Sequence, residues 1–390
     1  MQKIFSLIGL FVFVGIAYLL SKDKKNINWR GIVLTFIVQL VVAFLMVKTP
    51  LWKVVEVASG LVEKFLSQAQ YGLDFVFGSL ASDTFVFFIG SLCPIVFVSG
   101  VIGIIYHFGI LQKIFIFIGK YIAKIFDIDS TVVLNYVGNC IFGQTDALML
   151  SKSKLKDASE SIIFATMVGG FSSVSASVIG LYSSMGASVE WILVSLPLTV
   201  FSCIVLTQIV MPTKYNGDDL VIENDDKGEN FIDTAMIFAT NGFKCVVGIT
   251  VALILFISLT YMINNILGAI FSGLTLEKIV GIIFYPLALL MGVPMNELGL
   301  ASQLLASRFI MNEVVAFGLP AYGMLSETTK CFMTVALMGF SGLGSIAIML
   351  GSYQAIAPNQ TKVVARVGFK ALVVATLATI MTGTLVALFL

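Results

Sequence analysis

Long runs without a charged residue recur along the whole chain. They cover residues 4–20, 31–47, 85–106, 161–189, 191–211, 245–263, 331–361 and 371–390. A helix needs about 20 mainly apolar residues to cross the hydrocarbon core of a bilayer, and backbone groups in lipid must form their hydrogen bonds within the segment. The pattern therefore predicts an all-α polytopic membrane protein that contacts lipid over most of its length.

The first run could be a signal peptide or a retained helix. It lacks a small-residue cleavage site, and it ends in Ser21-Lys22-Asp23-Lys24-Lys25, which is typical of a stop-transfer flank. We interpret it as a spanning helix. The basic residues of the loop that follows place this loop in the cytoplasm and the N-terminus outside.

Charged residues divide the rest of the chain. Residues 51–70 and 111–126 mix lysines with apolar residues and are typical of helices that lie at the membrane interface. Residues 213–230 are acidic and hydrophilic, and we expect a solvated loop there, since they lack the spacing of a calcium loop. We divide the chain into an N-terminal scaffold (1–128), a first repeat (129–212), this loop (213–230) and a second repeat (231–390).

Two apolar segments do not have the pattern of spans. Residues 131–145 are short and end in Gly143-Gln144-Thr145-Asp146, whereas residues 279–296 are interrupted by prolines and glycine and end next to Glu297. Each is typical of one arm of a re-entrant hairpin. Non-helical backbone at membrane depth is tolerated only inside protein or beside a water-filled cavity, so both tips are expected to face a cavity.

Each hairpin is followed by a long run with a weak centre. Gly170-Phe171-Ser172 opens a string of small residues in the first run, and Gly339-Phe340-Ser341 opens one in the second. Such strings lower helix propensity, although they also serve close helix packing. The acidic tip precedes the string by 170 − 146 = 24 positions in the first copy and by 339 − 297 = 42 in the second. Corresponding broken segments in two halves favour a transporter.

Composition excludes several other classes. Of the 390 residues, 58% are hydrophobic and 12% are charged, and the net charge is +1, so nothing indicates a nucleic-acid partner. The five cysteines form no C-x-x-C pair and there is a single histidine. An enzyme is therefore not expected, because no activated nucleophile and base can be assembled from these residues.

The tips carry the candidate chemistry. A carboxylate at the bilayer centre costs about 2.5–3.5 kcal/mol, so Asp146 and Glu297 require a function. With Gln144 and Thr145 they offer donors and acceptors to a neutral, hydrogen-bonding solute, or to a coupling cation. An ion channel or passive pore on the same broken helices is the alternative, but it is expected to show a ring-forming selectivity filter.

At these motifs the sequence resembles a known family. Gly143-Gln144-Thr145-Asp146, the stretch 291–297, Asn312-Glu313 and the stretch 339–347 are similar to signature motifs of the concentrative nucleoside transporters. The resemblance implies a homotrimer in the bacterial inner membrane, surrounded by lipid. Each protomer would have about eight spanning helices, with two re-entrant hairpins in inverted repeats and interfacial helices. The function implied is symport of nucleosides with sodium or protons, and no cofactor other than the coupling ion.

The resemblance also implies roles for particular residues. Sodium would be held by the side chains of Asn139 and Ser173 and by the carbonyl groups of Phe142 and Val174, which are the hard oxygen ligands that suit it. Nucleoside would bind to Gln144, Thr145, Asp146, Val178, Glu297, Phe340 and Ser345. Two positions differ from the family pattern, which has Glu at 146 and Asn at 342 where this chain has Asp and Gly. The preferred base is left open.

Overall fold

The computed structural model describes residues 2–390 except 83–85, 218–221 and 223–226, and its described part is helical without strands. The N-terminal part begins with two long helices and continues through shorter ones to a π-helical turn, η1. In order these elements are α1 (Gln2–Leu19), α2 (Trp29–Lys48), α3 (Leu51–Ser67), α4 (Ala69–Phe77), α5 (Ser79–Ser82), η1 (Phe88–Leu92), α6 (Pro94–His107) and α7 (Ile110–Phe126).

The middle of the chain alternates short helices with longer ones. A 13-residue helix comes first, and two very short helices follow it. The elements are α8 (Ser130–Phe142), α9 (Asp146–Met149), α10 (Lys152–Lys156), α11 (Glu160–Ser172), η2 (Ala176–Val178), α12 (Ile179–Ser184) and α13 (Val189–Val210).

The C-terminal part repeats this order after one very long helix. Another 13-residue helix is followed by two short helices, a pair of helices with a gap between them, and a long last helix. The elements are α14 (Phe231–Ile270), α15 (Leu276–Met291), α16 (Leu298–Ile310), α17 (Glu313–Gly318), α18 (Pro320–Gly323), α19 (Glu327–Leu337), α20 (Gly344–Ile356), η3 (Pro358–Gln360) and α21 (Thr361–Phe389).

Polar residues in the sequence determine where many of these helices begin. The side chains of Asp129, Ser159, Ser188 and Ser326 each accept a hydrogen bond from a backbone N–H in the first turn of α8, α11, α13 and α19. These caps satisfy donors that a helix start otherwise leaves unpaired. In both repeats the helix that leads into the break, α11 or α19, therefore begins with a serine cap.

Seven helices of the described chain are long and apolar enough to cross a membrane. They match the runs predicted at 4–20, 31–47, 85–106, 161–189, 191–211, 245–263 and 371–390. The remaining run, 331–361, is divided between α19 and α20, each too short to span alone. The predicted stretches 51–70 and 111–126 are helical in α3 and α7. Part of the acidic segment 213–230 lies outside the described residues.

One end of the molecule gathers the loop between α1 and α2 with several other helix ends. Lys22 forms an ion pair with Glu160 at the start of α11, and Arg366 near the start of α21 contacts the same carboxylate. The N–H of Lys22 donates to the carbonyl of Val210 at the end of α13. Asn28 donates to Asp127 at the end of α7. The basic first loop therefore lies with the starts of α11 and α21 and the ends of α7 and α13.

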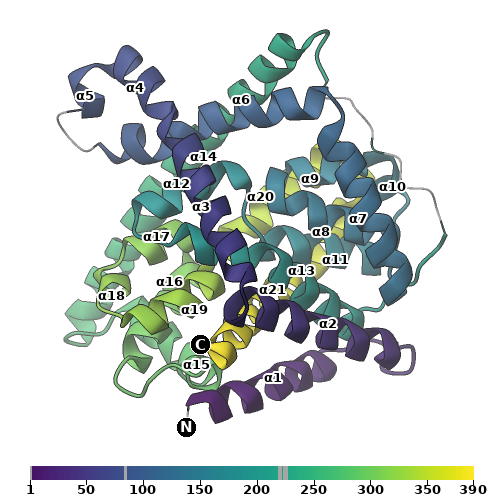
Figure 1. Cartoon of the computed structure of the whole chain (residues 1–390). Helices are drawn as coiled ribbons and strands as arrows, with labels where there is room; N and C mark the ends of the chain where they lie inside the picture. Colours follow the sequence, from purple (N-terminus) through teal and green to yellow (C-terminus); the bar gives the residue numbers. More distant parts are fainter. Residues whose placement is uncertain (1, 83–85, 218–221, 223–226) are drawn as a thin grey trace.

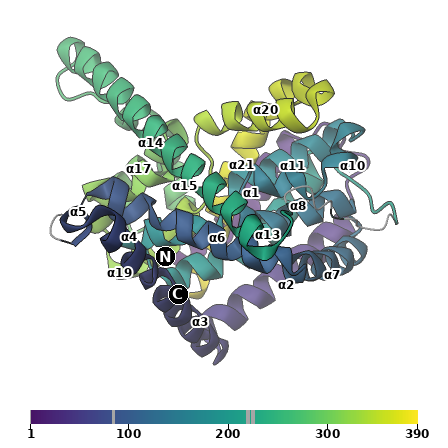
Figure 2. The same ribbon diagram turned by 90° about the horizontal axis from the view of Figure 1, so that it is seen from above.

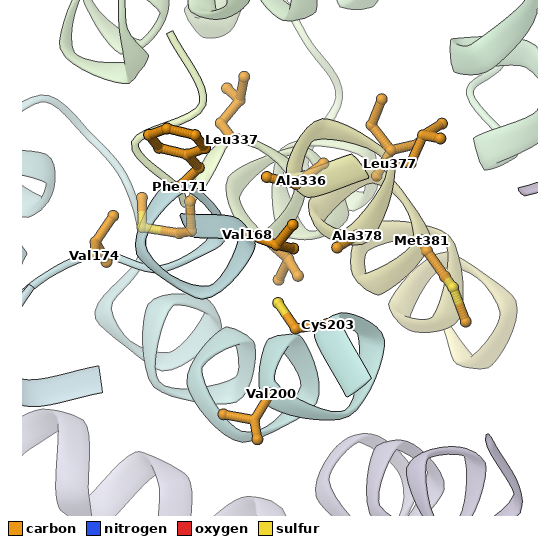
Figure 3. Packing of buried hydrophobic residues seen from close by; sticks show 14 of the residues in the cluster. Val168, Phe171, Val174, Val200, Cys203, Ala336, Leu337, Leu377, Ala378 and Met381 are labelled. Atoms are coloured by element: carbon orange, nitrogen blue, oxygen red, sulfur yellow. The ribbon is translucent and has the colours of Figure 1, made fainter. Parts of the chain in front are cut away.

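The core lies where the two repeats cross. Helices α11 and α13 of the first repeat pack against α19 and α21 of the second. Figure 3 shows this packing, with Val168, Phe171 and Cys203 from one repeat close to Ala336 and Ala378 from the other. Figure 1 shows α21 passing behind the middle of the molecule, and Figure 2 shows α14 projecting away from the remaining helices. The broken helices are therefore held at the centre of the protein.

Candidate functional site

The two helix breaks contact each other. Helix α11 ends at Ser172 and α19 ends at Leu337, and neither chain regains an α-helix for several residues. The N–H of Phe340 donates to the carbonyl of Ser173 at 3.4 Å, and the hydroxyl of Ser341 donates to the carbonyl of Phe171 at 2.7 Å. The breaks predicted in the two Gly-Phe-Ser strings are thus confirmed. They release backbone groups at the centre of the molecule.

The first tip packs on this crossing. Gly143 ends α8 with a φ of 83°, a conformation that glycine adopts at little cost. A Cβ at this position would lie 3.0 Å from Ser175 and 3.7 Å from Phe340, so the tip touches both breaks. The hydroxyl of Ser175 donates to the carbonyl of Ile141 at 2.9 Å. Tip and breaks therefore form one polar cluster.

The predicted substrate residues of the first half lie around this tip. The side chain of Gln144 is buried and its Oε1 has no hydrogen-bond partner, and Thr145 donates to Asp146 at 3.1 Å. Val178 is buried in η2, directly after the first break. A buried amide oxygen without a partner is costly. It is an acceptor that a donor on a bound solute can satisfy.

The second half has two chain reversals. The first, at residues 292–297, joins α15 to α16, and the second, at Met311 and Asn312, joins α16 to α17. The second reversal contacts the second helix break. The N–H of Leu343 donates to the carbonyl of Phe309 at 3.0 Å, and a Cβ at Gly342 would lie 2.2 Å from the carbonyl of Met311.

Glu297 is placed away from this crossing. Its carboxylate accepts hydrogen bonds from the N–H and the hydroxyl of Ser326, at 3.0 and 3.2 Å. Ser326 caps α19, whose 11 residues separate it from the second break, a distance of about 16 Å at 1.5 Å per residue. The prediction that the reversal at 292–297 lies at the breaks with the first tip is therefore not matched by these contacts.

Glu313 takes the expected place instead. It is the first residue of α17 and is 3% exposed. Its Oε1 accepts a hydrogen bond from Tyr182 in α12 at 2.9 Å, and its Oε2 has no partner. Both Asp146 and Glu313 are close enough to Cys245 to interact with it electrostatically.

The repeat itself shows why Glu313 corresponds to Asp146. Each follows a 13-residue helix and begins the next short helix. Glu313 precedes its Gly-Phe-Ser string by 339 − 313 = 26 positions, close to the 24 positions that separate Asp146 from Gly170. The unequal spacing of 24 and 42 came from using Glu297. The nearly equal spacings of 24 and 26 positions agree with the assignment of Glu313 that the contacts give.

The predicted sodium residues lie on two adjoining segments. Asn139 in the last turn of α8 is fully buried and donates to Asn135 at 2.9 Å, while its own amide oxygen has no partner. Ser173 donates to the carbonyl of Gly169 at 2.8 Å. Phe142 ends α8 and Val174 lies in the first break, so their carbonyl groups belong to the same two segments. A cavity of about 10 Å³ borders Ser173 and Gly169.

Known families match nearly the whole chain. The profile described as "Na+ dependent nucleoside transporter N-terminus" matches residues 8–80, "Nucleoside recognition" matches residues 88–189, and "Na+ dependent nucleoside transporter C-terminus" matches residues 191–387. The chain belongs to the nucleoside transporter family. The family is one of transporters, and the resemblance carried by the short motifs is confirmed.

Individual relatives agree with this. The transporter is 31% identical over its full length to an "Uncharacterized transporter" of Haemophilus influenzae, covering 98% of that protein. It is 29% identical to the "Nucleoside permease NupC" of Helicobacter pylori, with 100% and 98% of the two chains covered. The human "Sodium/nucleoside cotransporter 1" is 27% identical, with 95% and 61% covered.

Solved structures share the fold. CNTnw in an inward-facing substrate-bound state superimposes with a TM-score of 0.93 at 31% identity, covering 100% of the transporter and 98% of that chain. A variant of CNTnw in an outward-facing state has the same TM-score of 0.93, covering 100% and 99%.

Proposed function

We propose that the transporter is a secondary active symporter that imports nucleosides, driven by an inward sodium gradient. The observation that carries the coupling is the unpartnered amide oxygen of Asn139, which is buried in the last turn of α8, a helix that packs against α11, the helix that leads into the first break. Sodium takes oxygen ligands, and discontinuous helices supply freed carbonyl groups for such ions. The family description and the printed name of the human relative both refer to sodium.

The nucleoside is proposed to bind between the first tip and the crossing of the breaks. Gln144, Thr145, Asp146 and Val178 would contact the base, because these residues surround a buried amide acceptor. Phe340 and Ser345 flank the second break and would contact the ribose with a carboxylate. Hydroxyl groups of a sugar donate well to a buried carboxylate.

For that carboxylate we propose Glu313 in place of Glu297. Glu313 has a free oxygen and lies at the reversal that touches the second break. Both oxygens of Glu297 are already paired with Ser326. The ribose contact expected of Glu297 is therefore assigned to Glu313.

The membrane arrangement is also a proposal. The segment α8–α10 begins and ends near the cytoplasmic loop, because Asp129 contacts Asn216 and the carbonyl of Lys156 accepts from Asn359 and Gln360. It would therefore be re-entrant. The segment α16–α18 would enter from the opposite side as its inverted copy. With α19 and α20 counted as one broken span, the chain would span a bacterial inner membrane eight times.

A homotrimer surrounded by lipid is the proposed assembly. Helix α14 is 40 residues long, and only 11% of its most apolar window is buried within the chain. It packs against α6, and its far end projects away from the other helices in Figure 2. Its exposed apolar side chains include Phe243, Val247, Val251, Ile254 and Leu255. An apolar surface of this length requires lipid or another protomer to cover it.

Uptake into proteoliposomes tests the proposed function. Labelled uridine or inosine should accumulate above its external concentration only when an inward sodium gradient is imposed. A passive pore would equilibrate the label without exceeding that concentration. Competition by a panel of nucleosides and free bases would then identify the preferred base, which the Asp at position 146 leaves open.

A further inference from the structure

Arg308 is a fully buried charge in the last turn of α16. One of its terminal N–H groups donates to the carbonyl of Ala336 and to the hydroxyl of Thr379, the latter at 2.7 Å. Its Nε and Nη2 have no hydrogen-bond partner. Burying an ionised group is costly unless a charge of opposite sign compensates it. The opposite charge here is Glu313, which interacts with Arg308 electrostatically and has one free oxygen.

The position of Arg308 corresponds to that of Asn139. Arg308 precedes its Gly-Phe-Ser string by 339 − 308 = 31 positions and Asn139 precedes its own by 170 − 139 = 31, and each lies in the last turn of its helix. Both helices have 13 residues and lead to an acidic residue after a short tip. The same turn of the same helix therefore carries an amide in one repeat and a guanidinium in the other.

The surroundings correspond as well. Thr379, the partner of Arg308, lies 389 − 379 = 10 residues before the end of α21, and Thr199 lies 210 − 199 = 11 residues before the end of α13. Thr199 and Ser173 line the small cavity of the first repeat. In the second repeat the guanidinium donates to the carbonyl of Ala336 in α19 and to the hydroxyl of Thr379 in α21.

We infer that Arg308 is a resident cation that takes, in the second repeat, the place proposed for sodium in the first. Its positive charge compensates the carboxylate of Glu313. Its N–H groups stay hydrogen-bonded to the oxygens of Ala336 and Thr379 next to the second break. The first repeat must then bind a sodium ion to satisfy the free amide oxygen of Asn139. In the second repeat the guanidinium of Arg308 already occupies the corresponding place. One sodium ion per nucleoside follows, and only the first tip responds to the ion. This inference rests on the proposed function.

The test separates charge from hydrogen bonding at position 308. Arg308→Lys keeps a positive charge, whereas Arg308→Gln keeps N–H donors and removes the charge. Uptake of labelled uridine into proteoliposomes is measured against sodium concentration for both variants. We expect Arg308→Lys to stay within about threefold of the parent with a sodium Hill coefficient near one. Arg308→Gln should lose more than about tenfold, because it leaves Glu313 buried and uncompensated.

Other readouts exclude a merely structural effect. In Arg308→Gln another cation should be able to fill the place of the missing guanidinium. Added guanidinium ion should then restore part of the lost uptake, or a second sodium ion should be required, which would raise the sodium Hill coefficient toward two. Arg366→Gln, at an exposed arginine, serves as the matched control and should keep the parent's sodium dependence.

Equal uptake by Arg308→Gln and the parent, or equal loss in the Lys and Gln variants with no effect of guanidinium, would overturn the inference. A parent protein whose uptake ignores sodium would instead contradict the proposed function. The two failures are therefore distinguishable.

Discussion

Gly342 shows at the scale of one residue how the second reversal and the second break fit together. A Cβ there would lie 2.2 Å from the carbonyl oxygen of Met311 and 3.3 Å from that of Arg308. Because both neighbours are backbone atoms, neither can move aside as a flexible side chain would. The contact therefore leaves room for glycine alone at position 342. An amide at this position requires a wider separation of the two segments.

Gly342→Ala is therefore expected to reduce uptake and destabilise the protein, by about 1–3 kcal/mol for a substitution that overpacks a close contact. Thermal unfolding in detergent and uridine uptake would measure both effects. Gly351→Ala is the matched control, because nothing lies within 4 Å of a Cβ there and the position is in the middle of α20. Unchanged stability in Gly342→Ala would show that the contact relaxes.

The assignment of Glu313 gives a second prediction at this scale. Charge-assisted hydrogen bonds contribute about 1.5–3 kcal/mol, so Glu313→Gln should weaken nucleoside transport roughly ten- to a hundredfold. Cargo that lacks the 2′ and 3′ hydroxyl groups should be affected least, and competition against labelled uridine measures this.

Glu297→Gln is the matched comparison for Glu313→Gln. It breaks contacts to Ser326 at the start of α19. It should therefore reduce the transport of normal and of dideoxy nucleosides to the same extent. A loss specific to hydroxylated cargo in Glu297→Gln, but not in Glu313→Gln, would return the ribose role to Glu297.

At the scale of elements, the breaks in α11 and α19 are stabilised by each other. Carbonyl groups released at the end of α11 accept hydrogen bonds from Phe340 and Ser341, so much of the backbone that leaves the helix is satisfied across the crossing. The end of α8 adds Asn139, whose amide oxygen remains free. An ion at this place would join α8 to the first break.

Removing its ligands should therefore act on sodium first. Asn139→Ala and Ser173→Ala should each raise the sodium concentration that gives half-maximal uptake, while nucleoside affinity at saturating sodium changes little. Binding of the two ligands is reciprocally linked, so the factor by which sodium raises nucleoside affinity must equal the reverse factor. Calorimetric titration of each ligand with and without the other checks this equality.

Ser352→Ala, at a half-buried serine of α20 whose hydroxyl bonds only within its helix turn in the described structure, controls for the loss of any helical hydroxyl group and should behave as the parent. The sodium assignment would be wrong if uptake of the unmodified protein ignored sodium and stopped when a proton gradient was dissipated. Asp146 and Glu313 would then be the residues to examine for the coupling proton.

At the scale of the whole molecule, one carboxylate connects three distant segments. Glu160 at the start of α11 is paired with Lys22 from the first loop and with Arg366 from α21. Its side chain is 29% exposed, and such pairs are each worth about 0.2–1 kcal/mol and are screened by salt. The junction ties the cytoplasmic ends of both repeats together.

Glu160→Gln should lower the unfolding temperature of the purified protein by a few degrees, and the difference should shrink at high ionic strength. The Michaelis constant for nucleoside should not change, because the junction lies far from the crossing. Glu327→Gln is the control, since Glu327 is 89% exposed and pairs only within its own helix turn. An altered Michaelis constant in Glu160→Gln would indicate that the junction takes part in transport.

The sequence by itself determined the membrane class, seven of the long helices, both helix breaks and the first tip. These features are local, because the length of an apolar run, a glycine or a capping serine acts on its own neighbourhood. Only the tertiary structure decided which acidic residue of the second repeat corresponds to Asp146. Asn296-Glu297 and Asn312-Glu313 are both polar pairs that interrupt apolar helices, and the sequence does not show which reversal packs against Gly342. That choice depends on contacts between segments far apart in the chain, which form only when the two repeats cross.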